Sequence, residues 1–191
     1  MKLWLVRHAQ PLVEPGVCYG ALDVPADPQA TRDAARALAQ GLPQGIRLLH
    51  SPLQRCEQLT QALCGLRPDL VPEIDVRLKE MDFGQWEGQR WDAIARAELD
   101  GWTAAFPTWR CGGAESVQGF MTRVAAVWDA TRALQGPAVW ITHAGVIRAA
   151  TLLAQGLRTL ERADQWPQVA PAWGQWLEQD LTIGPSRHEP Q

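Results

Sequence analysis

Two short stretches of the sequence, LWLVRH at residues 3–8 and AVWITH at residues 138–143, have the same form. Each begins with an apolar run of the length of a buried strand, and each ends in a histidine, His8 or His143. In an open α/β sheet, ligands bind just beyond the carboxyl ends of the strands. If the two strands are neighbours in the sheet, both imidazoles therefore lie in the same crevice.

The rest of the chain alternates between short apolar runs and longer helical patterns. This alternation predicts an α/β fold with three layers, in which a mostly parallel sheet carries helices on both faces. The expected strands cover residues 3–6, 46–50, 70–76 and 138–142, with a weaker candidate at 172–177. The expected helices cover residues 29–42, 51–63, 91–99, 115–134 and 146–153. Ser51, directly before Pro52, is expected to cap the second helix.

Residues 79–113 break this alternation. Glycines and prolines interrupt a segment that holds four tryptophans, Trp86, Trp91, Trp102 and Trp109. Insertions outside a scaffold often carry substrate-binding surface, because their backbone is less constrained. We therefore expect one domain over residues 1–184, with a substrate-covering excursion at residues 79–113 and a flexible tail at residues 185–191. The tryptophans are expected to pack the excursion, although one of them could stack on a flat aromatic substrate.

The composition limits the classes of function. The 191 residues include 18 Lys and Arg against 21 Asp and Glu, a formal net charge of −3 at pH 7, and 46% of them are hydrophobic, as in a globular protein. A dedicated nucleic-acid binder or a protein adapted to anionic membranes would concentrate Lys and Arg, so neither is expected. No apolar run approaches the roughly 20 residues that span a bilayer, and the first one is too short for a signal peptide. We therefore expect a cytoplasmic location.

Groups that bind anions gather at the predicted carboxyl edge of the sheet. Arg7 adjoins His8, Arg55 lies one turn into the helix after the second strand, and His143 precedes the N-terminus of another helix. A guanidinium group matches phosphate oxygens with a planar fork of donors, so this edge suits a small anion. The chain contains no Gly-x-Ser-x-Gly, His-Glu-x-x-His, Gly-x-x-x-x-Gly-Lys or Cys-x-x-Cys motif, which argues against the serine, metal and redox sites that those motifs build.

Five blocks of sequence make the chain recognisable. In chain order they are Arg7–Gln10 (RHAQ), Ser51–Arg55 (SPLQR), Leu78–Gly88 (LKEMDFGQWEG), Gly112–Ser116 (GGAES) and Thr142–Arg148 (THAGVIR). Together they resemble the histidine phosphatase superfamily, in the branch that also holds the cofactor-dependent phosphoglycerate mutases. The blocks follow the family's order, so the set is far more specific than any one of them.

The resemblance implies a phosphoglycerate mutase-like fold and a phosphomonoester hydrolase that needs neither a metal nor another cofactor. It implies that His8 is the nucleophile and forms a phosphohistidine, and that Glu80 is the general acid. It also implies that Arg7, Arg55 and His143 bind the phosphoryl oxygens. Flanking guanidiniums should favour the neutral form of the nucleophilic imidazole, because they oppose a further positive charge.

The chain departs from the family's usual pattern at two positions. Ala9 stands where Gly is more common, and Glu14 stands where many relatives carry an Asn that contacts the phosphate. Asp82 and Glu87 are further carboxylates close to Glu80 in the sequence, and the position of Glu80 within its block favours Glu80 as the acid. The departures leave open a second class of function, a catalytically idle phosphate-binding or interaction module on the same scaffold.

The stretch Gly16–Pro25 (GVCYGALDVP) resembles α-ribazole-5′-phosphate phosphatases of cobalamin biosynthesis. This favours a small phosphorylated metabolite as the partner, with Gln10, Tyr19 and Gly20 as possible substrate-binding residues. Neither nucleic acid nor a membrane is expected as a partner, and the protein is expected to be a monomer or a homodimer. The alternatives within the enzyme class are a phosphoglycerate mutase-like phosphotransferase and a sugar-phosphate phosphatase.

Overall fold

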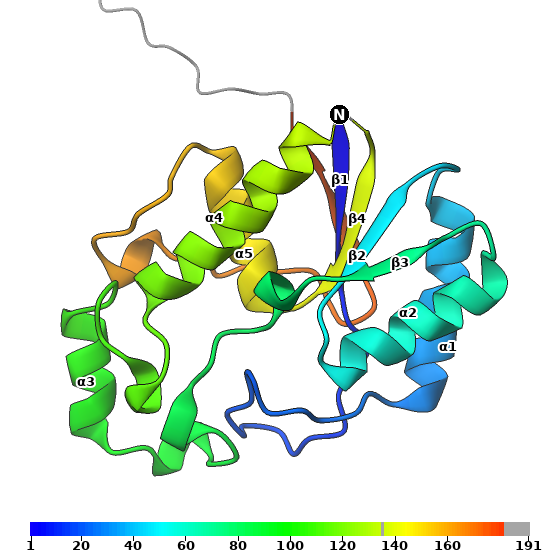
Figure 1. Cartoon of the computed structure of the whole chain (residues 1–191). Coiled ribbons are helices and arrows are strands. Elements are labelled where there is room, and N and C mark those ends of the chain that lie inside the picture. The colour runs from blue at the N-terminus through cyan, green and yellow to red at the C-terminus, as the bar shows by residue number, and fades with distance from the viewer. Residues whose placement is uncertain (135, 182–191) are drawn as a thin grey trace, which may run out of the picture.

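The computed structural model describes residues 1–134 and 136–181 and builds them around a five-stranded sheet (Figure 1). The strands are β1 (Lys2–Arg7), β2 (Arg47–His50), β3 (Pro72–Ile74), β4 (Ala138–Thr142) and β5 (Trp176–Asp180). Their order in the sheet is β3-β2-β4-β1-β5, with β5 antiparallel to β1 and all other neighbours parallel. The prediction of a mostly parallel sheet is confirmed. The tail predicted at residues 185–191 lies outside the described residues.

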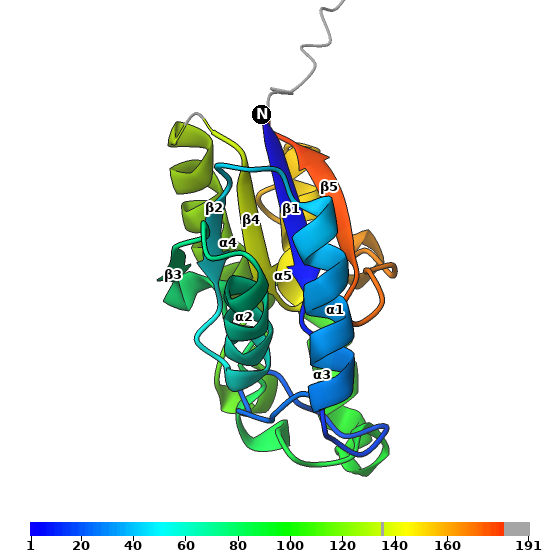
Figure 2. The ribbon, with the colours of Figure 1, turned by 90° about the vertical axis from the view of Figure 1, so that its right-hand side faces the viewer.

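Helices cover both faces of this sheet (Figure 2). On one face lie α1 (Pro28–Gly41) and α2 (Gln54–Leu66), and on the other lie α4 (Val117–Ala133) and α5 (Ala144–Ala154). The short helix α3 (Arg96–Ala104) lies away from the sheet, at the lower left of Figure 1. The three-layer α/β/α architecture is therefore the predicted one.

The alternation of side chains along β1 supplies both layers of the core. Leu3 and Leu5 pack in the cluster that includes α4 and α5, whereas Trp4 and Val6 pack in the cluster that includes α1 and α2. All five residues of β4 are buried, and the four apolar ones, at 138–141, alternate between the same two clusters. A strand that is buried on both faces has a continuous apolar sequence, which is why the sequence identifies these two strands clearly.

The first turn of α2 differs from the prediction. Asp27 and Ser116 cap α1 and α4, each accepting a backbone N–H, at 2.7 and 3.1 Å. The prediction that Ser51 caps the second helix is wrong, because Leu53 is the N-cap residue of α2 and makes no side-chain cap. The buried hydroxyl of Ser51 lies instead 2.8 Å from His143 Nε2.

The edges of the sheet and the excursion also differ from the predicted ranges. Only Pro72–Ile74 of the apolar run at residues 70–76 pairs with β2, and a 3-10 turn at Val76–Leu78 follows. The weak strand expected at residues 172–177 forms later, as β5. The helix expected at residues 91–99 begins as a 3-10 turn, and Ile94, in an extended conformation, separates that turn from α3. Edge strands pair on one side only, so their apolar pattern is a weaker signal.

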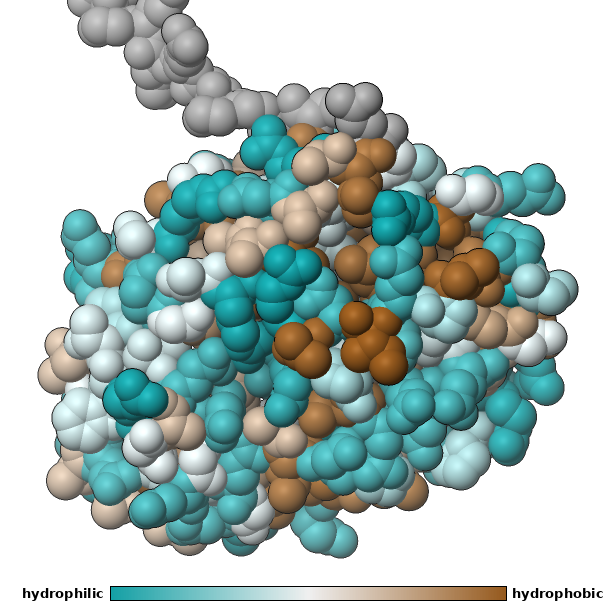
Figure 3. Space-filling view, in the orientation of Figure 1, coloured by the Kyte–Doolittle hydropathy of each residue, from teal (hydrophilic) through white to brown (hydrophobic). Residues whose placement is uncertain are grey.

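The surface is mostly polar in the view of Figure 3, with exposed apolar side chains over the region of β3. Val71, Ile74 and Val76, in and beside this edge strand, have 77%, 64% and 66% of their surface exposed. Among the helices of the described ranges, none combines the length and the apolar character needed to cross a membrane.

The register of β1 and β4 brings the two histidine-ended stretches together. Arg7 lies opposite Thr142, and the backbone N–H of His8 donates to the carbonyl oxygen of Thr142 at 3.0 Å. His8 and His143 therefore leave the sheet side by side, at the carboxyl ends of neighbouring parallel strands, as their sequence positions predicted.

Candidate active site

The two imidazoles meet at the carboxyl edge of the sheet. The ring centroids of His8 and His143 are 5.2 Å apart, and the ring planes are inclined by 57°. Both side chains are buried. Burial holds the pKa of His143 well below its ordinary value, and the nearby positive charge of Arg55 lowers it further. His143 therefore offers this corner a neutral imidazole.

Hydrogen bonding fixes the tautomer of His8. Its Nδ1 lies 2.7 Å from the carbonyl oxygen of Ala9, which can only accept, so the hydrogen is on Nδ1. The lone pair is then on Nε2. Burial, reinforced by the positive charges of Arg55 and Arg7, lowers the pKa of His8 to about 3. At physiological pH the ring is therefore neutral, and Nε2 can act as a nucleophile.

Two arginines flank this imidazole, and each has an unpaired donor. Arg7 donates from Nη1 to the carbonyl oxygen of Pro171 at 3.0 Å. Arg55 is fully buried and donates from Nη1 to Leu22 at 2.8 Å and from Nη2 to Gly20 at 2.6 Å, in both cases to the carbonyl oxygen. Within the described residues, the buried Nε of each arginine has no hydrogen-bond partner. An anion at this corner would satisfy donors that are otherwise costly to bury.

The carboxylate of Glu80 is held against the first turn of α5. Its Oε2 accepts from the backbone N–H of Gly145 at 2.9 Å, and its Oε1 accepts from the backbone N–H of Met81 at 3.0 Å. Gly145 is required for this contact, because a Cβ at that position would collide with Oε1 of Glu80. The two backbone N–H groups fix both oxygens of the carboxylate.

Arg123 of α4 fixes the chain segment that carries Glu80. Its guanidinium donates to the carbonyl oxygens of Arg77, Lys79 and Glu80 at 2.8, 2.7 and 3.0 Å. The same guanidinium forms an ion pair with Glu115 at 2.7 Å. Three backbone carbonyls and one carboxylate thus tie the segment around Glu80 to the rigid helix α4.

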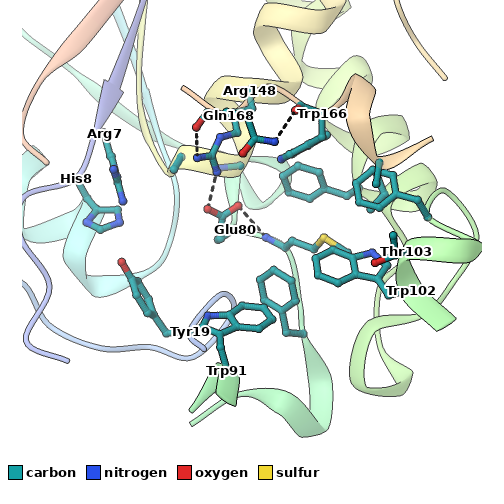
Figure 4. Close-up of a pocket in the computed structure, with 18 residues that line it drawn as sticks. Arg7, His8, Tyr19, Glu80, Trp91, Trp102, Thr103, Arg148, Trp166 and Gln168 are labelled. Atoms are coloured by element: carbon teal, nitrogen blue, oxygen red, sulfur yellow. Dashed lines mark hydrogen bonds between the residues drawn. The ribbon is translucent and has the colours of Figure 1, made fainter. Parts of the chain in front are cut away.

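A cavity of about 450 Å³ opens from this corner. Figure 4 shows Arg7 and His8 on one side of it and Trp102, Thr103 and Trp166 on the other, with Glu80 between them. The cavity wall also contains Phe83, Trp91, Phe106, Phe120, Arg148 and Gln168. The site therefore joins a charged, hydrogen-bonding end to an aromatic end.

The predicted site residues fall into three groups. Those that line the cavity are Arg7, His8, Tyr19 and Glu80. Arg55 and His143 lie directly behind them: the Cζ of Arg55 is 5.4 Å from the ring centroid of Tyr19, and His143 contacts the ring of His8. The third group, Gln10 and Gly20, is not part of the cavity wall in the described structure.

The positions of the third group have a physical cause. Gln10 is exposed, and its carbonyl oxygen accepts from the backbone N–H of Asp27 at 2.7 Å, which ties it to the start of α1. Gly20 is buried against the carbonyl oxygen of Met81, where a Cβ has no room. Glu14, the departure from the family pattern, is exposed and outside the cavity wall, so its carboxylate does not face a ligand there.

Three polar residues of the cavity wall, Thr103, Arg148 and Gln168, were not predicted as site residues. Arg148 donates from Nη2 to the carbonyl oxygen of Gln168 at 3.1 Å, and its Nε is buried without a partner within the described residues. Arg148 lies one turn after Gly145 on α5, so helical spacing could have placed it at the site. Gln168 lies in a stretch without secondary structure, and no sequence pattern marks it.

Comparisons with known proteins agree with this arrangement. A protein of Hydrogenobacter thermophilus, provisionally named phosphoserine phosphatase 2, is 28% identical over 167 residues, which are 82% of this chain and 79% of that protein. The solved structure of a mycobacterial glucosyl-3-phosphoglycerate phosphatase has a TM-score of 0.70 at 25% identity, and the match covers 82% of this chain and 80% of that one. The names of these two relatives refer to different phosphate esters, so the comparison does not identify one substrate for this chain.

Two further findings define the fold and the family. The solved structure of a protein from Thermus thermophilus has a TM-score of 0.70 at 28% identity, and the match covers 93% of this chain and 92% of that one. A mycobacterial hydrolase, which is 24% identical, matches in fold with a TM-score of 0.76, and the match covers 93% of this chain and 80% of that one. The model of the histidine phosphatase superfamily (branch 1) matches residues 3–180. The chain thus belongs to branch 1 of the histidine phosphatase superfamily.

Proposed function

We propose that the protein hydrolyses phosphomonoesters through a phosphohistidine formed on His8. One observation carries this proposal: a buried imidazole with its lone pair on Nε2 lies beside two guanidiniums that have unpaired buried donors, at the end of a cavity. A neutral imidazole with a free lone pair is what nucleophilic attack on a phosphate requires, and a strongly lowered pKa beside charged partners in a cavity marks a candidate functional residue. The pKa of about 3 keeps His8 in that form throughout the physiological range.

In the first step, the lone pair of His8 Nε2 attacks phosphorus, and the bond between phosphorus and the ester oxygen breaks. Arg7 and Arg55 hold the phosphoryl oxygens through their Nε groups, and the neutral His143 adds a hydrogen-bonding group behind His8. The leaving alkoxide takes a proton from the carboxyl of Glu80, which lines the cavity next to the site of attack. Positioning and charge stabilisation supply most of the rate in such a transfer.

In the second step, water attacks the phosphohistidine. The carboxylate of Glu80, now without its proton, accepts one from that water, and the bond between phosphorus and Nε2 breaks. Inorganic phosphate leaves, and His8 returns to its neutral state. The two backbone N–H groups that hold Glu80 keep its carboxyl group in place for both steps.

For the substrate, we propose α-ribazole 5′-phosphate, on the resemblance of Gly16–Pro25 and on the room that the cavity leaves beyond a phosphate. A second candidate, an acidic ester such as phosphoserine, is favoured by Arg148, whose buried Nε is free to pair with a carboxylate in the same cavity. The two are separated by kcat/KM across a panel of α-ribazole 5′-phosphate, phosphoserine, 3-phosphoglycerate and sugar phosphates. A mutase would convert 3-phosphoglycerate without releasing phosphate.

The test of the reaction itself is a labelling experiment. Wild-type protein given a radiolabelled phosphomonoester should acquire an acid-labile, base-stable label and release phosphate, and His8→Ala should do neither. His50→Asn is the matched control, because His50 is also buried at the end of a strand but does not line the cavity. It should label as wild type does. If the wild type never labels and releases no phosphate from any ester, the protein is an idle phosphate-binding module and the proposal is wrong.

A further inference from the structure

The end of the cavity opposite His8 is built almost entirely from aromatic rings. Its wall contains Phe83, Trp91, Trp102, Phe106, Phe120 and Trp166. A phosphoryl group and a short alcohol would occupy only the corner at His8 and Glu80, whereas a cavity of about 450 Å³ has the size of sites that bury a larger organic ligand. The aromatic end is therefore large enough to bind a further part of the substrate, beyond the phosphoryl group and a short alcohol.

The rings of this end already hold one another in place. The Trp91 and Trp102 rings are stacked, with centroids 6.4 Å apart and planes inclined by 16°, and Phe106 stacks on Trp102 at 5.7 Å and 20°. Phe83 meets Trp91 edge-on, at 5.4 Å and 84°. Side chains that are fixed by such contacts lose little freedom when a ligand binds, so the wall is preorganised for a flat group.

Besides Arg7 Nε, two buried donors on the cavity wall lack a hydrogen-bond partner within the described residues. The indole Nε1 of Trp102 is buried without a hydrogen-bond partner in the described structure, and the buried Nε of Arg148 on the adjoining wall is unpaired as well. Among the described residues, Glu80 is the one acidic side chain of the cavity wall, and two backbone N–H groups hold its carboxylate. A ring with an acceptor atom on its edge would meet both the apolar wall and these donors.

We propose that this end of the cavity is a subsite for a flat, uncharged aromatic group of the leaving alcohol, with Trp102 and Phe106 as specificity-determining residues. The preferred substrates are then phosphomonoesters whose alcohol carries such a ring, so of the two candidate substrates the inference favours the aromatic ester over the acidic one. The inference rests on the proposed phosphatase function, since it concerns the leaving group of that reaction.

The test compares three primary-alcohol esters whose chemistry at phosphorus is alike: 2-(1-naphthyl)ethyl phosphate, n-butyl phosphate and phosphoserine. Burial of the naphthyl ring should raise kcat/KM about 10- to 100-fold over the butyl ester, mainly through KM. Trp102→Leu should reduce this ratio about tenfold, whereas Trp102→Phe, which keeps a flat ring, should retain most of it. If Trp102→Leu does not fold, Phe106→Leu provides the same measurement.

Trp109→Leu is the matched control, because Trp109 lies in the same excursion but outside the cavity wall, and it should leave both the ratio and the rates unchanged. Equal kcat/KM for the naphthyl and butyl esters, a preference for phosphoserine, or an equal loss on both alkyl esters in Trp102→Leu would overturn the aromatic subsite. These results differ from a failure of the proposed function, in which no ester releases phosphate and His8 acquires no label.

Discussion

The contact between the backbone of Gly145 and the carboxylate of Glu80 can be tested by a single substitution. A methyl group at position 145 would occupy the place of that carboxylate. We expect Gly145→Ala to reduce kcat about 10- to 100-fold, the range for a catalytic group displaced by about 1 Å. The loss should be larger for n-butyl phosphate than for p-nitrophenyl phosphate, whose good leaving group needs less protonation. Any loss of folding stability should be small, because the carboxylate lies at the end of the flexible Glu80 side chain and can move away from the methyl group.

Gly119→Ala is the matched control for this substitution. Gly119 also lies in the first turn of a helix, α4, but a Cβ there would meet Ser116 Oγ only at 3.4 Å, an ordinary contact. This variant should keep wild-type kcat on both esters. A Gly145→Ala protein with full kcat, or with the same fractional loss on both esters, would contradict the placement of Glu80 as proton donor.

At the residue scale, the sequence identified groups that stand next to a clear pattern. His8, Arg7 and His143 could be predicted because each borders a buried strand, and Glu80 because it lies in a distinctive block. Ser51, the partner of His143, could not be predicted, because a serine before Pro52 has the local signature of a helix cap. Only the packing of β2 against β4 brings its hydroxyl to the imidazole of His143, 92 residues away in the sequence. Contacts made by tertiary packing leave no local signature.

At the scale of elements, Arg123 joins helix α4 to the segment that carries Glu80. We expect Arg123→Gln to lower kcat, because the carbonyls of Arg77, Lys79 and Glu80 lose their common donor and the segment is no longer fixed. Stability should fall by about 1–3 kcal/mol, since the half-buried Glu115 loses its charged partner. Steady-state kinetics and urea unfolding measure the two effects.

The control for Arg123→Gln is Arg158→Gln. Arg158 forms an ion pair of 2.6 Å with Asp129, also of α4, but both side chains are about half exposed, so the pair contributes little. This variant should retain kcat and lose less than about 1 kcal/mol. An Arg123→Gln protein that is less stable but has unchanged kcat would show that Arg123 is structural and does not position Glu80.

Elements were predictable from the sequence to the extent that they are buried on both sides. β4 is found at the predicted residues, because a central strand must be apolar throughout. β3 and β5 are edge strands, and their ranges moved by several residues because half of their hydrogen-bonding groups face no partner. In the excursion, the pattern at residues 91–99 is set by aromatic packing around Trp91 and Trp102, which overrides helical spacing.

At the scale of the whole molecule, a net charge of −3 coexists with a site that collects positive charge. Arg7, Arg55 and Arg148 lie around the same corner, together with the N–H groups at the start of α5. Net charge describes the whole surface, whereas the potential inside a cavity follows its own wall. A mildly acidic protein can therefore bind a small phosphate ester while it disfavours long polyanions.

Burial of the two imidazoles, reinforced by this collection of positive charge, makes the folded protein sensitive to acid. The pKa of His8 is about 3 in the folded state and about 6.5 in the unfolded chain. At a pH between these two values, His8 is neutral in the folded protein and takes up a proton when the protein unfolds. The unfolded state then binds more protons between these two values, so stability is complete above about pH 6.5 and falls as the pH decreases toward 3. His143, whose pKa is also lowered, acts in the same direction.

We therefore expect the free energy of unfolding to be lower at pH 5 than at pH 7.5, with a contribution of about 2 kcal/mol from His8. His8→Asn should remove this contribution, because its side-chain amide can still donate to the carbonyl oxygen of Ala9 but does not titrate. Urea unfolding of both proteins at the two pH values, in buffers without phosphate, measures the difference, since bound phosphate would itself stabilise the fold. An equal pH dependence in wild type and His8→Asn would mean that His8 is already protonated in the folded protein at pH 5, and that the guanidiniums around it do not keep its imidazole neutral.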